Sequence, residues 1–150
     1  MDWLESLDLV VPGFVASVEF GFFIFVRPML RSLPERFLVQ VDQNVVRTYG
    51  RVMPVFTGIS VILILFYALR LTENNAANQA VWIAVFFFSA AVATSIWLNQ
   101  PIESEIWNWD PENLPADWKS VHRRWVVAQG IRSSLQLAGF VVFCISVAAR

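Results

Sequence analysis

Two ionisable side chains, Glu19 and Arg132, interrupt long apolar stretches of this 150-residue chain. A charge in the middle of a membrane-spanning helix costs about 3 kcal/mol on insertion scales, so such a residue needs a partner or a function. A carboxylate can take a proton as a general base, and a guanidinium can stabilise the anion that remains. Glu19 and Arg132 are therefore the candidate catalytic residues. Two structural roles stay open: the residues form an ion pair, or a protonated Glu19 bonds to Gln136.

Other polar residues accompany this pair on two predicted helical faces. Spacings of seven, three and four residues put one set on a single face, and that set is His122, Gln129, Arg132 and Gln136. A second face carries Asn99, Glu103 and Trp107. Together the two faces predict a pocket that opens toward the cytoplasmic interface. Its candidate substrate-binding residues are Asn99, Glu103, Trp107, Trp125, Gln129 and Gln136. Hydrogen bonding between helices is the alternative role for the two glutamines.

His122 is the only histidine and Cys144 the only cysteine. One histidine cannot make a two-histidine metal site, so no metal ligands are predicted and any cofactor is unknown; a single haem ligand is the weaker alternative. The neighbouring Arg123 and Arg124 are expected to anchor lipid headgroups. The tryptophans of this region are expected at the membrane interface, with stacking on an aromatic substrate as the alternative: Trp107, Trp109, Trp118 and Trp125.

The composition is that of a membrane protein. Hydrophobic residues make up 57% of the chain and charged residues 15%, against about 25% charged in soluble domains. A net charge of −1 gives no indication of nucleic-acid binding. A membrane-spanning helix needs about 20 apolar residues, and four continuous stretches qualify, over 9–30, 52–69, 80–98 and 126–149. They predict one all-α domain over 1–150, a four-transmembrane-helix bundle.

The basic residues predict the orientation of this bundle. With four spans, the first and third loops share one side and the termini share the other. The loop side carries most of the basic residues, namely Arg27, Arg31, Arg36, Arg47, Arg51, Lys119, Arg123 and Arg124, whereas the other side has Arg70 and Arg150. Positive charge favours the cytoplasm. We therefore expect a protein of the bacterial inner membrane with both termini on the non-cytoplasmic side.

Amphipathic helical extensions are predicted on the cytoplasmic side. Ser32 and Glu35 have the spacing of a capping box, and apolar residues recur at helical spacing over 37–49. This segment should lead into the second span. Pro115 suits the first turn of a second extension, which leads into the fourth span.

Small residues and aromatic residues predict how the spans pack and where they meet the interface. Rows of small residues at four-residue spacing let helices approach closely; they are Gly13-Ser17-Gly21, Gly130-Ser134-Ala138, Ser89-Ala93 and Ala90-Thr94. An aromatic belt is expected at the span ends, formed by Trp3, Tyr49, Tyr67, Trp82 and Trp97.

Spaced polar and aromatic residues give the chain a family resemblance. They lie in 21–34, 37–49, 51–54, 98–102, 106–107, 110–112, 114–118, 124–125, 132 and 137–140. On these residues the chain resembles the DUF1772 or anthrone oxygenase-like family of small four-helix membrane proteins. Some members are implicated in oxidising anthrones to anthraquinones. The resemblance implies a shared role for Asn99, Trp125 and Arg132. The chain departs from the pattern at Glu103, often an asparagine in the family, and at Gln129, where a histidine often stands between the tryptophan and the arginine.

The leading functional hypothesis is a membrane-embedded, oxygenase-like enzyme acting on a lipophilic phenolic or anthrone-type substrate. The expected partners are membrane lipids, that lipophilic aromatic substrate, and either membrane-complex subunits or further copies of the chain. The alternative is a non-catalytic structural or accessory subunit of a larger membrane complex. Transport is a weaker third hypothesis, because four spans are too few for the inverted repeats of most transporters.

Overall fold

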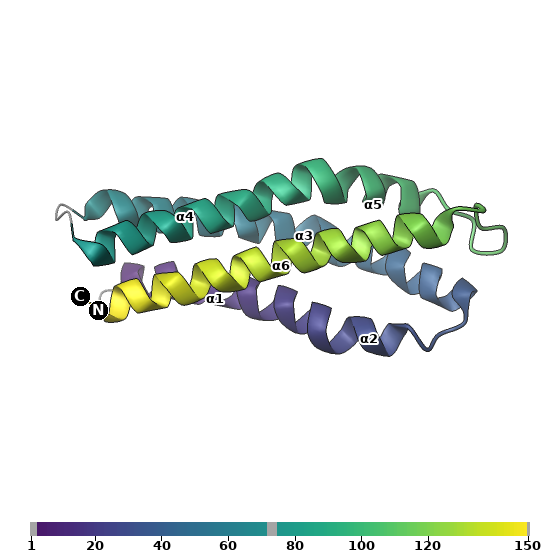
Figure 1. The fold of residues 1–150 in the computed structure, drawn as a ribbon, viewed down its shortest axis with the longest axis horizontal. Coiled ribbons are helices and arrows are strands. Elements are labelled where there is room, and N and C mark those ends of the chain that lie inside the picture. Colours follow the sequence, from purple (N-terminus) through teal and green to yellow (C-terminus); the bar gives the residue numbers. More distant parts are fainter. Residues whose placement is uncertain (1–2, 72–74, 150) are drawn as a thin grey trace.

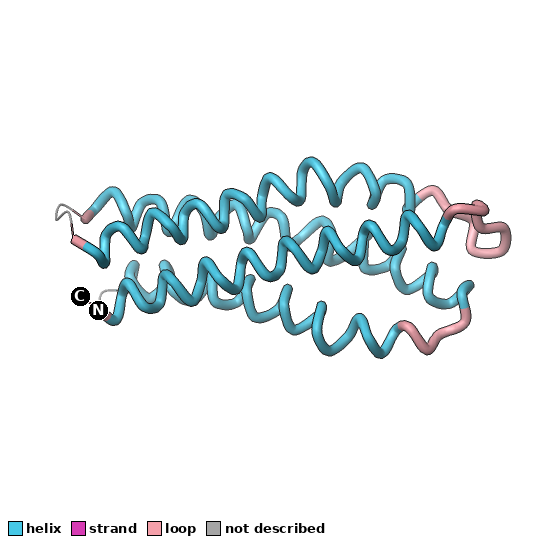
Figure 2. Tube along the Cα trace, viewed as in Figure 1, coloured by secondary structure: helices cyan, strands magenta, loops and turns pink. Residues whose placement is uncertain are grey.

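A computed structural model describes residues 3–71 and 75–149, and four long helical rods run back and forth through them (Figure 1). The first rod consists of α1 (Trp3–Gly21), η1 (Phe22–Val26) and α2 (Arg27–Leu30), and the second is α3 (Glu35–Arg70). The third consists of α4 (Ala76–Thr94), η2 (Ser95–Asn99) and α5 (Gln100–Trp107), and the fourth is α6 (Trp118–Ala148). The loops lie at the two ends of the rods (Figure 2). The predicted all-α four-helix fold is confirmed.

The outer surface of the bundle is apolar. All four rods are long and apolar enough to cross a membrane, and large hydrophobic side chains face outward, among them Phe25 at 72% exposure and Trp97 at 75%. Charged groups such as Glu19 and Arg132 are buried instead. This inverts the pattern of a soluble protein, in which charged residues are almost never fully buried. The chain is an integral membrane protein.

The rods extend beyond the apolar stretches that the sequence predicts. α3 has 36 residues and α6 has 31, whereas about 20 residues cross the hydrocarbon core. The helical extension over 37–49 is therefore confirmed as part of α3. The termini lie together at one end of the bundle, and the loops over 31–34 and 108–117 lie at the other (Figure 1). We call the latter the loop end.

The rods form a four-membered ring. α1 packs against α3 and α6, and α4 packs against the same two helices. Every rod therefore has two neighbours and one face toward the interior. A side chain on that inner face can meet groups from three other rods.

Two π-helical turns widen the rods, and each is followed by a proline. η1 ends two residues before Pro28, and η2 ends two residues before Pro101. Proline donates no backbone hydrogen bond and its ring clashes with the carbonyl four residues earlier, which a wider turn relieves. Turns of this kind are frequent at functional sites. Here η1 comes directly before the buried Arg27, and η2 ends with the buried Asn99.

Two apolar clusters fill the ends of the interior. The cluster near the termini contains Ile64, Tyr67, Ala68, Val81, Ala84, Phe88 and Phe143. The cluster at the loop end contains Val39, Ile106, Trp109, Trp118, Val121 and Trp125. Three of the tryptophans expected at the interface are thus buried against protein, because the extended helices and the third loop enclose them. Tyr67 and the half-buried Tyr49 also face inward rather than joining an aromatic belt.

The predicted rows of small residues are only partly at helix contacts. A Cβ added to Gly13 would lie 2.8 Å from the Phe140 ring, and one added to Gly130 would lie 2.7 Å from the Phe23 ring. These glycines make room for aromatic side chains of neighbouring rods. Ser17 and Ser134, from the same two rows, are exposed on the outer surface.

Two predicted helix starts are wrong in detail. Pro34 is the N-cap of α3, and the Ser32 hydroxyl donates to the Met29 carbonyl at 2.8 Å instead of capping α3. α6 begins at Trp118 and not at Pro115, whose carbonyl accepts a turn hydrogen bond from the Trp118 amide. In both places a local turn takes the group that the sequence pattern assigned to the helix start, the Ser32 hydroxyl in one case and Pro115 in the other.

Candidate functional site

An ion pair between Glu19 and Arg132 lies in the middle of the bundle. Arg132 Nη2 donates to Glu19 Oε2 at 2.7 Å, and both side chains are only 3% exposed. Gln136 does not bond to Glu19; its Nε2 donates to the Thr57 hydroxyl at 3.0 Å. Of the two structural roles that the sequence left open, the structure therefore contains the ion pair.

Several buried polar atoms around this pair have no hydrogen-bond partner in the described part of the chain. They are Glu19 Oε1, Arg132 Nε, Gln136 Oε1, the Tyr49 hydroxyl and both amide atoms of Asn99. Leaving a buried polar group unsatisfied costs about 1–3 kcal/mol. A set of such atoms from all four rods therefore indicates that a polar molecule, water or a ligand, completes the site.

Tyr49 and Glu103 lie next to the central pair. The Tyr49 hydroxyl and the Glu19 carboxylate interact, at a geometry short of a full hydrogen bond. The Glu103 carboxylate is near enough to interact with the charges of both Glu19 and Arg132. Asn99, which is 1% exposed, lies one helical turn before Glu103 on the same rod. α1, α3, the third rod and α6 thus each contribute to one polar interior.

A second buried network lies between the central pair and the loop end. Arg27 Nη1 binds Asp42 Oδ1 at 2.6 Å, and Gln129 Oε1 accepts bonds from Arg27 Nη2 and Nε at 2.7 and 3.1 Å. The guanidinium also lies 4.2 Å from the centre of the Trp125 ring, a cation–π contact. His122 Nε2 lies 3.0 Å from Asp42 Oδ2, and its side chain is 18% exposed. His122 is therefore part of this network.

Glu103 connects the interior to a polar cleft at the loop end. The Trp125 indole donates to Glu103 Oε1 at 3.3 Å. Gly50 lets the carboxylate approach α3, since a Cβ there would lie 3.3 Å from Glu103 Oε2. The cleft has a volume of about 250 Å³. Its lining is Val46, Arg47, Gly50, Arg51, Glu103, Ser104 and Trp107.

A second cleft opens between α3 and the third rod toward the outer apolar surface. Its volume is about 260 Å³, and Pro54, Val55, Val92 and Ile96 form much of its lining. Thr57 also lines it, and Thr57 is the partner of Gln136. This cleft therefore reaches from the lipid-facing side to the polar interior.

Most of the predicted site residues face the same interior. Glu19, Arg132, Asn99, Gln129, Gln136 and Trp125 are buried there and Glu103 is half-buried. Trp107 lies apart from them: it is 39% exposed and its ring stacks on the Arg47 guanidinium at 4.5 Å. It lines the polar cleft at the loop end, beside Glu103, and not the inner site.

Sequence reasoning missed four interior residues, Arg27, Asp42, Tyr49 and Thr57. A signal for Asp42 was present, because it follows Leu38 by four residues and precedes Val45 by three, and so lies on the apolar face of its helix. Arg27 resembled a basic residue at the end of a span. Its burial depends on the return of α3 beside α1, which spacing does not show.

Among residues 3–71 and 75–149, no three His, Cys, Asp or Glu side chains are grouped so as to hold a metal ion. Comparisons with protein-family models, with curated proteins and with solved structures found no match.

Proposed function

We propose that this protein is a membrane-embedded oxygenase that oxidises a lipophilic phenolic or anthrone-type substrate. The observation that supports this most is the buried Glu19–Arg132 pair, in which Glu19 Oε1 and Arg132 Nε remain without partners. One atom can accept a proton and the other can donate to an oxygen anion. The resemblance of the chain to the anthrone oxygenase-like family points to the same substrate class.

In the proposed reaction Glu19 removes a proton from the activated methylene of the substrate. The electron pair of that C–H bond is delocalised through the aromatic rings to the conjugated carbonyl oxygen, and Arg132 stabilises the resulting enolate. Dioxygen is the oxidant: the enolate carbon transfers electrons to it and forms a C–O bond, giving a hydroperoxide after protonation. Loss of the second C–H proton and cleavage of the O–O bond then give a ketone and water. The overall balance is R₂CH₂ + O₂ → R₂C=O + H₂O.

Two features suit a substrate that arrives from the bilayer. The apolar cleft that reaches Thr57 gives lateral access from the lipid, and Gln136 behind it offers an unpaired Oε1 to a phenolic hydroxyl. The polar cleft at Glu103 provides a path to water for the proton that Glu19 receives. Glu103 and Asn99 are the polar groups between that cleft and the central pair. In this proposal the loop end faces the cytoplasm, because the exposed Arg31, Arg36, Arg123 and Arg124 lie there.

The direct test is turnover of an anthrone by the purified full-length chain, followed by oxygen uptake and quinone absorption. Glu19→Gln should lower kcat by at least about 100-fold, since a general base contributes roughly 10²–10⁴. Glu105→Gln is the matched control, because it makes the same substitution at an exposed residue outside the interior. This variant should turn over the anthrone like the wild type. Undiminished turnover by Glu19→Gln would remove Glu19 from the mechanism.

The same preparation addresses the accessory-subunit alternative. A folded wild-type protein that oxidises no anthrone, and that leaves the membrane in gentle detergent together with foreign subunits, would support that alternative. A single homogeneous species with turnover would support the oxygenase.

A further inference from the structure

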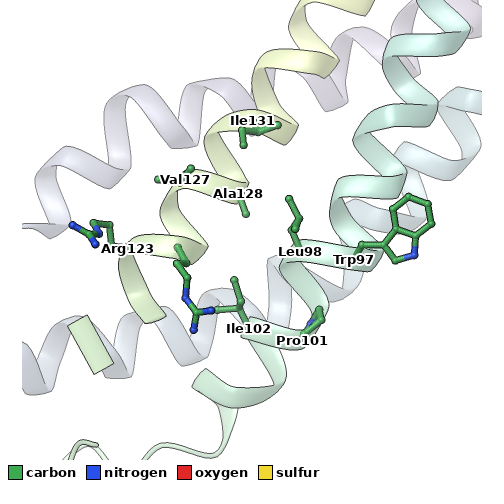
Figure 3. Close-up of a pocket in the computed structure, with 9 residues that line it drawn as sticks. Trp97, Leu98, Pro101, Ile102, Arg123, Val127, Ala128 and Ile131 are labelled. Atoms are coloured by element: carbon green, nitrogen blue, oxygen red, sulfur yellow. The ribbon is translucent and has the colours of Figure 1, made fainter. Parts of the chain in front are cut away.

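A groove on the lipid-facing surface runs between the third rod and α6 (Figure 3). Its volume is about 410 Å³, the largest of the three clefts described here. Both walls are apolar, with Leu98, Pro101 and Ile102 on one side and Val127, Ala128 and Ile131 on the other. Trp97, at 75% exposure, stands at the rim. An apolar groove that faces hydrocarbon fits an acyl chain.

Two arginines line the end of this groove that is nearer the start of α6. Arg123 and Arg124 are both exposed, and in Figure 3 the Arg123 side chain points to the side of α6 away from Leu98 and Ile102. The ion pairs found among the described residues all use other cations. No acidic residue lines the groove. The positive charge at this position is therefore available to an anion from outside the chain.

The depth of these residues matches that of a phospholipid. At 1.5 Å per residue, Arg124 lies about 36 Å along α6 from Ala148, whereas Ile131 lies about 26 Å from it. A hydrocarbon core is about 30 Å thick. The arginines therefore reach the headgroup layer, while Ile131 lies at the level of the acyl chains. On the opposite wall Pro101 and Ile102, about 38 and 39 Å along their rod from Ala76, lie at the level of the arginines. Trp97, about 32 Å along its rod from Ala76, is at the interface by the same measure.

We propose that this groove binds one anionic phospholipid, with the phosphate held by Arg123 and Arg124 at the level of Pro101 and Ile102, and an acyl chain extending from there along Leu98, Ala128 and Ile131. Guanidinium groups bind phosphate through paired hydrogen bonds. A zwitterionic lipid also carries a phosphate, but its ammonium would lie near the two arginines and reduce the attraction. Net charge therefore distinguishes the proposed anionic phospholipid from a zwitterionic one. This inference does not depend on the oxygenase proposal.

The test is native mass spectrometry of the full-length chain in detergent, titrated with phosphatidylglycerol or with phosphatidylcholine. The wild type should retain one phosphatidylglycerol with a preference of about tenfold or more, as expected for two basic groups at a membrane surface. Arg123→Gln with Arg124→Gln should bring the two lipids to similar affinity. Equal retention of both lipids by the wild type would overturn the proposal.

Two further variants separate the groove from a general attraction of positive charge. Arg31→Gln with Arg51→Gln removes the same charge from the loop end outside the groove and should leave the preference unchanged; an equal loss would show that the attraction is diffuse. Val127→Trp narrows the groove at an exposed position and should reduce bound lipid although both arginines remain. Unchanged occupancy in Val127→Trp, or equally effective competition by glycerol phosphate, would overturn the role of the apolar walls. Circular dichroism checks that each variant is folded.

Discussion

Arg132 and Glu19 lie 113 residues apart in the chain and meet at 2.7 Å in the middle of the bundle. Each uses one atom for this contact, and Glu19 Oε1 and Arg132 Nε remain without partners. A pair that served only to neutralise two charges would be expected to satisfy more of its bonding capacity, because unsatisfied buried groups are costly. Water or a ligand can satisfy these two remaining atoms.

The central pair should contribute to stability as a unit. Arg132→Gln leaves the Glu19 carboxylate buried without its cation and should lower the free energy of unfolding by about 3 kcal/mol. Adding Glu19→Gln removes that unpaired charge, so the double variant should be more stable than Arg132→Gln alone. Unfolding in mixed micelles with increasing dodecyl sulfate measures all three. Strictly additive losses would contradict the coupling.

Asp42 should be essential to the loop half of the bundle. Asp42→Asn weakens the ion pair with Arg27 and the contact with His122, and should lower the free energy of unfolding by about 3 kcal/mol because Arg27 stays buried. Amide hydrogen exchange should rise first around Arg27 and the start of α6. Asp117→Asn is the control: this residue is exposed and its side chain caps nothing, so its effect should stay within about 0.5 kcal/mol. Equal effects of the two variants would be inconsistent with the buried network.

Gly139 should be the glycine least tolerant of substitution among those in α3 and α6. A Cβ there would lie 2.9 Å from Phe87 Cβ and 2.9 Å from the buried Phe88 ring, so α4 and α6 would have to separate. Gly139→Ala should cost about 1–3 kcal/mol. A Cβ at Gly58 meets nothing within 4 Å, and Gly58→Ala should stabilise α3 by up to about 1 kcal/mol. The same unfolding titration compares them, and a stabilised Gly139→Ala would contradict the close packing.

The proposed orientation predicts which loops a membrane-impermeant maleimide reaches. In a Cys144→Ala background, Ser32→Cys and Asp117→Cys should be labelled only in inverted vesicles. Ala76→Cys, at the opposite end of the bundle, should be labelled in intact cells. The reverse pattern would place the termini in the cytoplasm.

The four-helix fold was predictable because its signal is local. Four apolar stretches of sufficient length are readable from the chain, and the polar face of α6 is visible in the spacing of Gln129, Arg132 and Gln136. The helix limits were less predictable. A turn at Pro34 and another at Pro115 compete with the cap and the first turn that the sequence suggests.

The candidate site was predictable on α6 and incomplete elsewhere. Glu19 and Arg132 were identified because a charge inside an apolar stretch is conspicuous. Thr57 and Tyr49 were missed because threonine and tyrosine are common in membrane spans and at their ends, and only the ring arrangement of the rods turns them inward. Trp107 was predicted to lie with the inner residues because helical periodicity shows which residues share a face. Periodicity does not show how much of that face the neighbouring rods cover.

The spectrum of the purified protein mixed with an anthrone in the absence of oxygen tests whether Glu19 is the base. Without its oxidant the reaction should stop after proton transfer, so the wild type should accumulate the absorption of the anthrone enolate. Glu19→Gln should show the spectrum of the neutral anthrone, and Arg132→Gln should show a strongly reduced enolate signal. An enolate spectrum of equal strength in Glu19→Gln, or none in the wild type, would contradict the assignment of Glu19 as the base.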